Sequence, residues 1–409
     1  MWQKGTDKGW MRKAAWVFAT RLLLVGVGFF IKILQTQYLG PEKYGYYALF
    51  ATIIGMGVFL FRFGFFASYQ VLLAETDNRQ EQRNLSGTAF LLVGLNGLLF
   101  AAFLFLTGFW VDALFDVQIG RILQWVSPFC IFLPFQFFIS AWGMGTGNVQ
   151  HTALFDTLSK VFYLISLLVL VGIGAFSLEA AIVLNVASFG MGTLLILVLV
   201  HPTFQDLGTS WRSLWRKTRT YGYHMYLGST LNNLTFRLDE VLISAWVNTT
   251  QLGFYTLSAV ICSPMNMLSQ ASSQALFKRF AGASSISRNI LILNLGWLLL
   301  AGTFLWLAGD RIVDWVLGPE YATVADYLPW MVVAYLFFGL YQPYLFLTAK
   351  SLGKQVRNAA YVETGVNVIG NLVFIPIYGV YGALGSTIGA KAVHFAVKHY
   401  YYLQYLKIR

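Results

Sequence analysis

The sequence is poor in charged residues and in cysteine. Only 11% of its 409 residues are charged, whereas soluble domains carry about 25%, which excludes an ordinary water-soluble domain. The two cysteines, Cys130 and Cys262, lie far apart in apolar segments, which excludes a disulfide framework and a cysteine metal site. We therefore expect both to be packing residues.

The sequence also has none of the common catalytic motifs. It contains no P-loop, no HExxH motif, no nucleophile elbow and no cluster among its five histidines. A self-contained ATP-driven pump is excluded because no nucleotide-binding motif is present. The loops are also too short for the catalytic domain expected of a membrane glycosyltransferase or polymerase. We expect a protein that is not an enzyme and needs no cofactor or metal.

Apolar residues make up 57% of the chain and gather in long runs. A membrane-spanning helix needs about 20 predominantly apolar residues, and about twelve segments meet this requirement. The sequence therefore predicts an all-α integral membrane protein. The expected spans are 14–38, 45–70, 86–109, 119–143, 151–174, 178–201, 219–246, 251–277, 287–308, 324–348, 357–377 and 379–405.

The basic residues predict the orientation of these spans. With a cytoplasmic N-terminus, twenty Lys and Arg residues fall on the inner side, Lys391 and Lys398 counted among them. Only Lys43, Arg121 and Arg311 fall on the outer side. This excess follows the positive-inside rule and predicts that both termini are cytoplasmic. It also explains most of the net charge of +11 without a nucleic-acid partner.

The longest inner loop divides the spans into two groups of six. It interleaves Trp211 and Trp215 with basic residues at helical spacing, a pattern typical of a helix lying on anionic lipid headgroups. A solvated positive loop with incidental tryptophans is the alternative. The predicted parts are an N-terminal lobe (1–201), a cytoplasmic amphipathic linker (202–218) and a C-terminal lobe (219–409).

The two halves also resemble each other in sequence. Residues 38–53 align with residues 246–261 at a constant offset of 208, which matches Gly45 with Gly253 and Tyr47 with Tyr255. Each block joins the first and second span of its half. Because six spans give both halves the same orientation, we expect a parallel repeat about a pseudo-twofold axis along the membrane normal, as in many transporters.

Ionisable residues within the first-half spans are mostly basic. Arg21 and Lys32 share one face of the first helix, and Arg62 reaches a similar depth on the second. With Lys160 and Asp156 these residues give a net charge of +3, which would be costly against lipid. The sequence therefore predicts a wet cationic cavity for a phosphate-bearing substrate. Snorkelling or pairing across helices is the alternative for each residue.

The second half carries polar stripes of mixed character. They admit three interpretations: lining of the same cavity, hydrogen bonds between helices, and a Na⁺ or H⁺ coupling site. The cavity-lining candidates are Asn233, Arg237 and Asn266, and the coupling candidates are Asp239, Glu240 and Glu363. Arg237 and Glu240 can also simply pair with each other.

Short motifs in a fixed order give the chain a family resemblance. They are YLGPEKYGYY at 38–47, RLD at 237–239, LGFY at 252–255, LGPEY at 317–321 and IPIYGVYGALGST at 375–387. In these motifs the sequence resembles the polysaccharide exporters of the superfamily that also contains the multidrug and toxin extruders and the lipid II flippases. The motifs are spread over nearly the whole chain.

The resemblance implies flipping of an undecaprenyl-pyrophosphate-linked oligosaccharide, such as an O-antigen or capsule repeat unit, to the outer leaflet of the bacterial inner membrane by alternating access. Flippases of this kind line their cavity with arginines, and Arg21, Arg62, Lys32 and Arg237 are the counterparts by placement. Membrane lipids, a polysaccharide polymerase and a chain-length regulator are the implied partners of a monomer. A cation-coupled multidrug extruder of the same superfamily is the alternative, as is a scaffold of a glycan-assembly complex.

Overall fold

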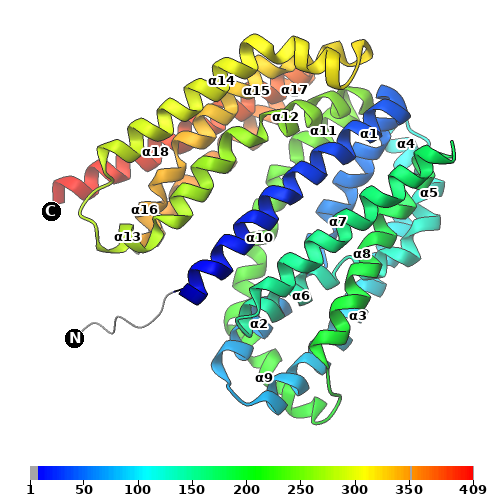
Figure 1. Ribbon diagram of the computed structural model, residues 1–409, viewed down its shortest axis with the longest axis vertical. Coiled ribbons are helices and arrows are strands. Elements are labelled where there is room, and N and C mark those ends of the chain that lie inside the picture. The colour runs from blue at the N-terminus through cyan, green and yellow to red at the C-terminus, as the bar shows by residue number, and fades with distance from the viewer. Residues whose placement is uncertain (1–7, 351, 409) are drawn as a thin grey trace. The chain divides into compact units, whose positions relative to one another are not determined.

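The computed structural model is built from helices joined by short connections. It describes the backbone of residues 8–350 and 352–408, and the side chains of these residues except 8–22, 149–150, 195–196, 228, 231–232, 236, 278, 281 and 408. In this part of the chain no strand is present. The helices follow the twelve predicted spans in order (Figure 1), which confirms the all-α membrane fold and a layout in two lobes.

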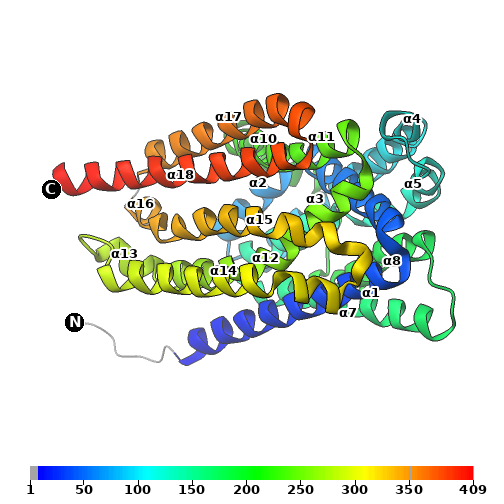
Figure 2. The ribbon, with the colours of Figure 1, turned by 90° about the horizontal axis from the view of Figure 1, so that it is seen from above.

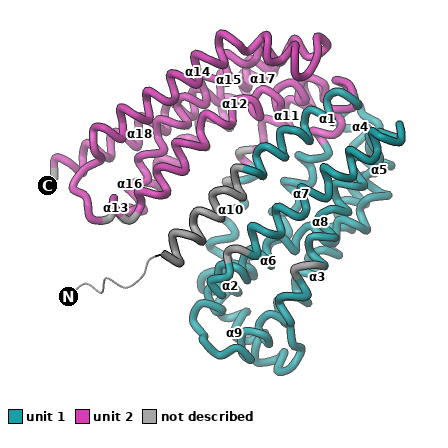
Figure 3. The backbone as a smooth tube through the Cα atoms, viewed as in Figure 1, with its two compact units in different colours: residues 1–39, 50–234 teal, residues 40–49, 235–409 magenta. Residues whose placement is uncertain are grey.

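The chain divides into two compact units, coloured separately in Figure 3. Unit 1 holds residues 1–39 and 50–234, and unit 2 holds residues 40–49 and 235–409. These units differ from the lobes expected from the sequence in two places. Residues 219–234 belong to unit 1, because they pack on the second span, and residues 40–49 belong to unit 2, because they pack on residues 249–256.

Unit 1 is built on the first six predicted spans. Two of its helices, α7 and α8, pack as a pair joined by a short turn (Figure 1). Buried aromatic side chains such as Phe66, Tyr69 and Phe138 form a core around α2, α3 and α6. The helices are α1 (Lys8–Leu60, with residues 40–49 in unit 2), α2 (Phe65–Glu75), α3 (Arg79–Thr107), α4 (Val111–Phe115), α5 (Gly120–Val126), η1 (Ser127–Phe132), α6 (Phe135–Gly145), α7 (Val149–Gly172), α8 (Leu178–Val200), α9 (Leu207–Lys217), η2 (Thr218–Gly222) and α10 (Tyr223–Phe236, shared with unit 2 at its end).

Unit 2 is built on the last six spans. Its long helices α14, α15 and α18 run side by side, and α17 packs along α18 (Figures 1 and 2). An aromatic core near one end includes Phe280, Tyr344, Phe346 and Tyr402. The helices are α11 (Leu238–Trp246), α12 (Thr249–Ala275), α13 (Phe277–Gly282), α14 (Arg288–Val316), η3 (Pro319–Tyr321), α15 (Ala322–Leu340), η4 (Gln342–Tyr344), α16 (Leu345–Ala349), α17 (Gly353–Tyr378) and α18 (Val380–Ile408).

Several helices end where the sequence supplies a specific signal. Asn78 caps α3, Ser177 caps α8 and Asn248 caps α12, each by accepting hydrogen bonds from backbone N–H groups of the first turn. Gly40, with φ 73°, interrupts the long helix α1 just before Pro41. The first two predicted spans therefore meet at this residue.

The fourth predicted span, 119–143, is divided into three shorter helices. Pro128 lies at the start of η1, and Pro134 lies directly before α6, where each proline interrupts the ladder of backbone hydrogen bonds. The carboxylate of Asp112 accepts hydrogen bonds from the N–H groups of Ile119 and Gly120 at 2.8 and 2.7 Å. This contact fixes the beginning of the span.

The outward faces of the helices are apolar. Along α14, Leu293, Leu300 and Leu307 recur at intervals of seven residues and are between 68% and 76% exposed, a face suited to lipid. Among the described residues, eight segments are long and apolar enough to cross a membrane. One of them, Leu23–Leu60, joins the first two predicted spans. The protein is therefore a multi-pass membrane protein.

The spans predicted at 219–246, 251–277 and 379–405 are not among those eight segments. They correspond to α10 with α11, to α12 and to α18. These helices carry polar side chains along one side, such as Asn266 on α12 and Lys391 on α18. Such side chains lower the hydropathy of a helix without shortening it, so these spans depend on protein packing more than on lipid.

Candidate functional site

The second span is broken at residues 61–64, between α1 and α2. Phe63 has φ 48° and Gly64 has φ 78°. A bulky residue in the left-handed region costs about 1–2 kcal/mol, and nothing in the local sequence demands it. The turn is supported by α10, because the Tyr226 hydroxyl donates to the Leu60 carbonyl at 2.8 Å and the Thr230 hydroxyl donates to the Phe59 carbonyl at 3.4 Å. The Leu60 carbonyl is one that the end of α1 leaves free, whereas the Phe59 carbonyl also accepts a hydrogen bond from the N–H of Arg62 at 3.4 Å.

Arg62 lies in this turn and is half-buried. Its guanidinium carbon lies 4.2 Å from the ring centroid of Phe137 and 5.5 Å from that of Phe59. The two rings are themselves neighbours, with centroids 5.4 Å apart, so they hold the guanidinium from one side. The edges that carry its five N–H donors remain the groups able to bind an anion in a forked arrangement.

A cavity of about 80 Å³ opens beside Arg62. Its other walls come from the start of α2 and from α10: Gly64, Phe66, Ala67, Met225, Tyr226 and Ser229. Because the residue before α2 is glycine, no N-cap side chain covers the first N–H groups of this helix. The start of a helix carries a partial positive charge and favours anions. The guanidinium and the helix start therefore place positive potential on one small cavity.

Three other residues of unit 1 were predicted to line the substrate cavity: Lys32, Arg21 and Asn233. Lys32 is half-buried on α1. The side chain of Arg21 lies outside the described residues. Asn233 lies on α10 one turn beyond Ser229, and its amide donates to the Ser229 carbonyl at 2.7 Å. Of the first-half candidates, Arg62 lines a cavity formed by described residues.

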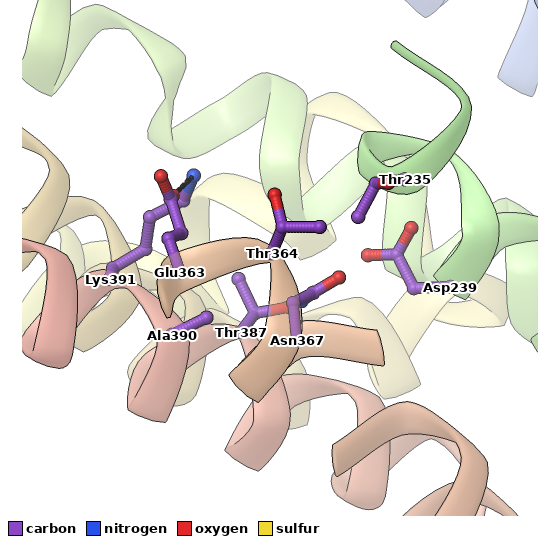
Figure 4. Close-up of a pocket in the computed structure, with 8 residues that line it drawn as sticks. All are labelled: Thr235, Asp239, Glu363, Thr364, Asn367, Thr387, Ala390 and Lys391. Carbon is purple, nitrogen blue, oxygen red and sulfur yellow. Dashed lines mark hydrogen bonds and ion pairs between the residues drawn. The ribbon is translucent and has the colours of Figure 1, made fainter. Parts of the chain in front are cut away.

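Unit 2 holds a second polar cavity, of about 40 Å³, shown in Figure 4. It brings Asp239 of α11 and Glu363 of α17, far apart in the sequence, into one site. Glu363 lies at one end beside Lys391, and Asp239 lies at the other end beside Thr235 (Figure 4). The lining between them consists of Thr364, Asn367, Thr387 and Ala390. A space of this size holds one or two water molecules or a bare cation.

Asp239 is held at the cavity by neighbouring donors. It is only 7% exposed, and its carboxylate accepts hydrogen bonds from the Tyr255 hydroxyl at 2.5 Å and from the N–H of Glu240 at 2.9 Å. Tyr255 is the residue that the repeat aligns with Tyr47. The adjacent Glu240 instead forms an ion pair with Arg237 at 3.2 Å, as the sequence allowed.

Glu363 belongs to a charged cluster that the sequence did not reveal. Its carboxylate forms an ion pair with Lys391 at 2.6 Å and contacts the Nδ1 atom of His394. The ring of His394 stacks on Tyr341, and Lys398 lies 4.5 Å from the centroid of the same tyrosine. The spacing of Lys391, His394 and Lys398 by three and four residues, one face of a helix, is the signal that could have revealed them.

This cluster corrects the interpretation of two inner lysines. Lys391 is nearly buried and paired with Glu363. Lys398, which lies on the same helix α18 as Lys391, packs on Tyr341. Both lysines lie in helix α18 and not in a loop. They therefore do not count toward the positive-inside rule, which concerns the loops between spans. Without them, eighteen basic residues are still expected on the inner side and three on the outer side.

Asn266 lies in neither cavity. It is 2% exposed on α12, and its amide faces α15, where a Cβ atom added to Gly339 would lie 2.8 Å from the Asn266 oxygen. Within the described part of the chain, neither amide atom of Asn266 has a hydrogen-bond partner. Cys130 and Cys262 are free and fully buried, which confirms that they are packing residues.

The chain thus forms two helical units with apolar outer surfaces, and each unit contains a polar cavity. Solved structures share this fold. A structure described as the lipid II flippase MurJ in an inward closed conformation matches with a TM-score of 0.72 and 13% identity, over 96% of this chain and 90% of that one. An inward-facing multidrug resistance MATE family transporter of the MOP superfamily matches with a TM-score of 0.67 and 12% identity, over 94% of both chains.

A third structure, the Vibrio cholerae MATE transporter VcmN in its bent form, matches with a TM-score of 0.53 and 12% identity, over 94% of this chain and 98% of that one. No curated protein matches the sequence. The model of the family described as polysaccharide biosynthesis protein matches residues 10–283. The chain belongs to this family, and it shares its fold with the flippase and transporter structures named above.

Proposed function

We propose that the protein flips oligosaccharide repeat units linked to polyprenyl pyrophosphate from the cytoplasmic to the outer leaflet of the bacterial inner membrane. Two findings support this function over the other transport functions of the superfamily. The family is one of polysaccharide biosynthesis, and the fold is shared with a flippase of a lipid-linked molecule. The transported unit would serve the synthesis of O-antigen, capsule or exopolysaccharide.

The observation that carries the proposal is the placement of Arg62. Its guanidinium packs against the neighbouring rings of Phe59 and Phe137 at a helix break, beside a cavity and the uncapped start of α2. A pyrophosphate matches this arrangement, because its oxygens accept forked hydrogen bonds from arginine and are favoured at a helix start. In the proposal, Arg62 binds the pyrophosphate, and Arg21 and Lys32 assist it from the first helix.

The glycan would be bound by polar residues of the later helices. In this part of the proposal Asn233 and Asn266 supply amide groups for sugar hydroxyls, and Arg237 supplies a further charge. Asn233 and Arg237 of the seventh span are half-buried, so part of each side chain is accessible to a ligand. The buried amide of Asn266 requires α12 and α15 to separate locally before sugar reaches it.

Ion coupling is assigned to the cavity of unit 2. Asp239, Asn367 and the threonines that line it offer oxygen atoms, the ligands that Na⁺ and other hard cations prefer. Glu363 gives the same cavity a second carboxylate, and His394 beside it gives a group that binds protons. The coupling ion is therefore Na⁺ or H⁺ in this proposal, and Glu240 acts through its pair with Arg237.

The two lobes would provide alternating access. In this scheme the lobes predicted at residues 1–201 and 219–409, connected by the amphipathic linker 202–218, alternate between inward-open and outward-open states, with both termini in the cytoplasm. The protein acts as a monomer and delivers its product to a polymerase and a chain-length regulator. The lipid tail stays in the bilayer throughout, because burying it inside the protein is unnecessary.

The test is complementation of a strain that lacks the gene. Wild type, Arg62→Ala, Arg62→Lys and the exposed control Arg288→Ala are compared at equal membrane abundance. Polyprenyl-linked oligosaccharide is then digested in spheroplasts with a membrane-impermeant glycosidase. Arg62→Ala should leave the lipid-linked glycan protected on the cytoplasmic face, Arg62→Lys should restore part of the export, and Arg288→Ala should behave as wild type. Full export by Arg62→Ala would overturn the assignment.

A second candidate function rests on the unit 2 cavity. Its two carboxylates, Asp239 and Glu363, would also suit a cation-coupled extruder of cationic drugs, and one solved structure with this fold is described as a multidrug resistance transporter. Overexpression should then confer resistance to cationic dyes, and deletion should leave the surface glycan unchanged. Flipping predicts the reverse in both experiments.

A further inference from the structure

Unit 1 contains a third and larger pocket, of about 480 Å³, at the junction of α9 and α10. Its lining consists of Phe63, Phe65, Trp215, Thr218, Arg219 and Tyr223. Residues 62–66 alternate between the two spaces. Phe63 and Phe65 line this pocket, whereas Arg62, Gly64 and Phe66 line the cavity described above. The larger pocket is therefore separate from the Arg62 cavity and shares one wall with it.

The walls of this pocket are aromatic and exposed. The ring of Trp215 stacks on Phe65 and on Trp211, with centroid separations of 6.1 and 5.6 Å. Trp215 is 40% exposed and Tyr223 is 51% exposed. Large aromatic side chains with one polar atom favour the boundary between membrane and water, so these rings are suited to contact with lipid.

Arg219 supplies the charge of the pocket. Its guanidinium carbon lies 5.4 Å from the ring centroid of Trp215, and it makes no ion pair with any carboxylate of the described residues. Thr218 contributes little polarity, since its buried hydroxyl is bonded to Ser68 at 3.0 Å and to the Leu214 carbonyl at 2.8 Å. The described lining of the pocket thus combines one cation with an aromatic surface and contains no acidic or amide side chain.

Helix α9, which carries Trp211 and Trp215, is anchored to the rest of unit 1 by one face. Ser210 and Leu214 are buried against unit 1, and Lys217 forms an ion pair with Glu75 at 2.5 Å. Arg212 and Arg216 are exposed beside the tryptophans. A helix fixed by one face that presents aromatic and basic residues on the others is typical of the surface of a membrane with anionic lipids.

We propose that this pocket binds the headgroup of an anionic membrane phospholipid. The phosphate accepts hydrogen bonds from Arg219, and the upper acyl carbons lie against Trp215, Phe65 and Phe63. A phosphate-bearing amphiphile fits better than a free glycan, because the lining offers sugar hydroxyls almost no carboxylate or amide partners. A bound lipid also contacts the strained residue Phe63, next to Arg62 in the same turn.

Native mass spectrometry of the purified full-length protein tests the proposal. Phosphatidylglycerol and phosphatidylcholine are titrated separately, and undecaprenyl phosphate is used as a competitor. Wild type should retain one phosphatidylglycerol in preference to phosphatidylcholine. Arg219→Gln should weaken this binding at least about tenfold, the loss expected for one hydrogen bond between charged groups. Arg219→Lys should retain part of it, and the exposed control Arg288→Gln should retain all of it.

Three results would overturn the proposal. They are equal retention of both phospholipids by wild type, unchanged binding by Arg219→Gln, and displacement of phosphatidylglycerol by equimolar undecaprenyl phosphate, which would assign the pocket to the carrier lipid. Melting of each variant without added lipid shows whether it is folded. Trp215→Leu gives a second variant, expected to weaken binding through the aromatic wall. None of these readouts depends on the transported substrate.

Discussion

Gly45 of α1 and Gly253 of α12, the two residues that the internal repeat aligns, pack directly against each other. A Cβ atom added to Gly253 would lie 3.2 Å from the Gly45 Cα atom, and one added to Gly45 would lie 2.8 Å from the backbone nitrogen of Thr250 and overlap the Thr249 carbonyl. Small residues at a helix crossing allow backbones to approach this closely. Corresponding segments of the two halves therefore meet in unit 2 at corresponding residues.

Gly45→Ala is predicted to destabilise the protein. The added methyl group meets backbone atoms, which have no rotamer to change, so the crossing must open; overpacking of this kind costs about 1–3 kcal/mol. Thermal unfolding in detergent measures the effect. Gly253→Ala should be milder, because its nearest neighbours lie at 3.2 Å or beyond.

The control for this pair is Gly296→Ala on α14, where an added Cβ atom meets no other atom within 4 Å. This substitution should leave the melting temperature unchanged or raise it, because alanine is the better helix former. If Gly45→Ala and Gly296→Ala melt alike, the crossing at Gly45 is not tightly packed.

The order and number of the spans could be predicted because hydropathy over about 20 residues determines whether a helix crosses a membrane. The break at Phe63 could not be predicted, because it depends on Tyr226 and Thr230 of another span donating to carbonyls at the end of α1. The sequence predicts a cationic cavity that includes Arg62, but it does not predict the helix break that forms one wall of the cavity. Local sequence patterns contain no information about such a partner.

The candidate residues divide in a similar way. Ionisable residues in a span are costly in lipid, and this cost alone directed attention to Asp239 and Glu363. Their shared cavity depends on the packing of α11 against α17, which no spacing in the sequence reports. Lys391 was counted among the inner basic residues although it lies within the expected span 379–405, and its partner Glu363 lies on the preceding helix.

Breaking the pair between Glu363 and Lys391 is predicted to be far more harmful than breaking the pair between Glu75 and Lys217. Glu363→Gln leaves a lysine buried without its partner, which costs about 3–5 kcal/mol, whereas an exposed pair is worth about 1 kcal/mol or less. Glu75 is 54% exposed and Glu363 is 8% exposed by side chain. Thermal unfolding of both single variants provides the comparison.

The double variant Glu363→Gln with Lys391→Met serves as the control. It removes both charges, so it should recover much of the stability that each single variant loses. Equal losses for Glu363→Gln and Glu75→Gln would show that the buried pair is solvated in the membrane-embedded protein.

Asp239→Asn is predicted to abolish the dependence of export on the coupling ion, whereas Glu240→Gln should preserve it. The carboxylate of Asp239 lines the unit 2 cavity, and the neighbouring carboxylate of Glu240 is paired with Arg237. Export of lipid-linked oligosaccharide is measured in membrane vesicles with an imposed Na⁺ or H⁺ gradient. Equal stimulation of both variants by the gradient would remove Asp239 from the coupling site.

The orientation of the chain is testable with single cysteines. Cys130 and Cys262 are fully buried, so the native protein should react little with a membrane-impermeant maleimide. Arg121→Cys should be labelled in intact cells, because the excess of inner basic residues places it outside. Arg212→Cys, equally exposed, should be labelled only after the membrane is opened. The reverse pattern would invert the topology.

The assignment of residues 40–49 to unit 2 has a consequence for biogenesis. These residues leave the ribosome early and enter the membrane with the first half, yet Gly45 packs on Gly253, which is synthesised 208 residues later. Until then the nascent chain must keep this segment in lipid or in the insertion machinery without its partner. The first half is therefore inserted before the packing of its second span is complete, and translation of the second half provides the missing surface.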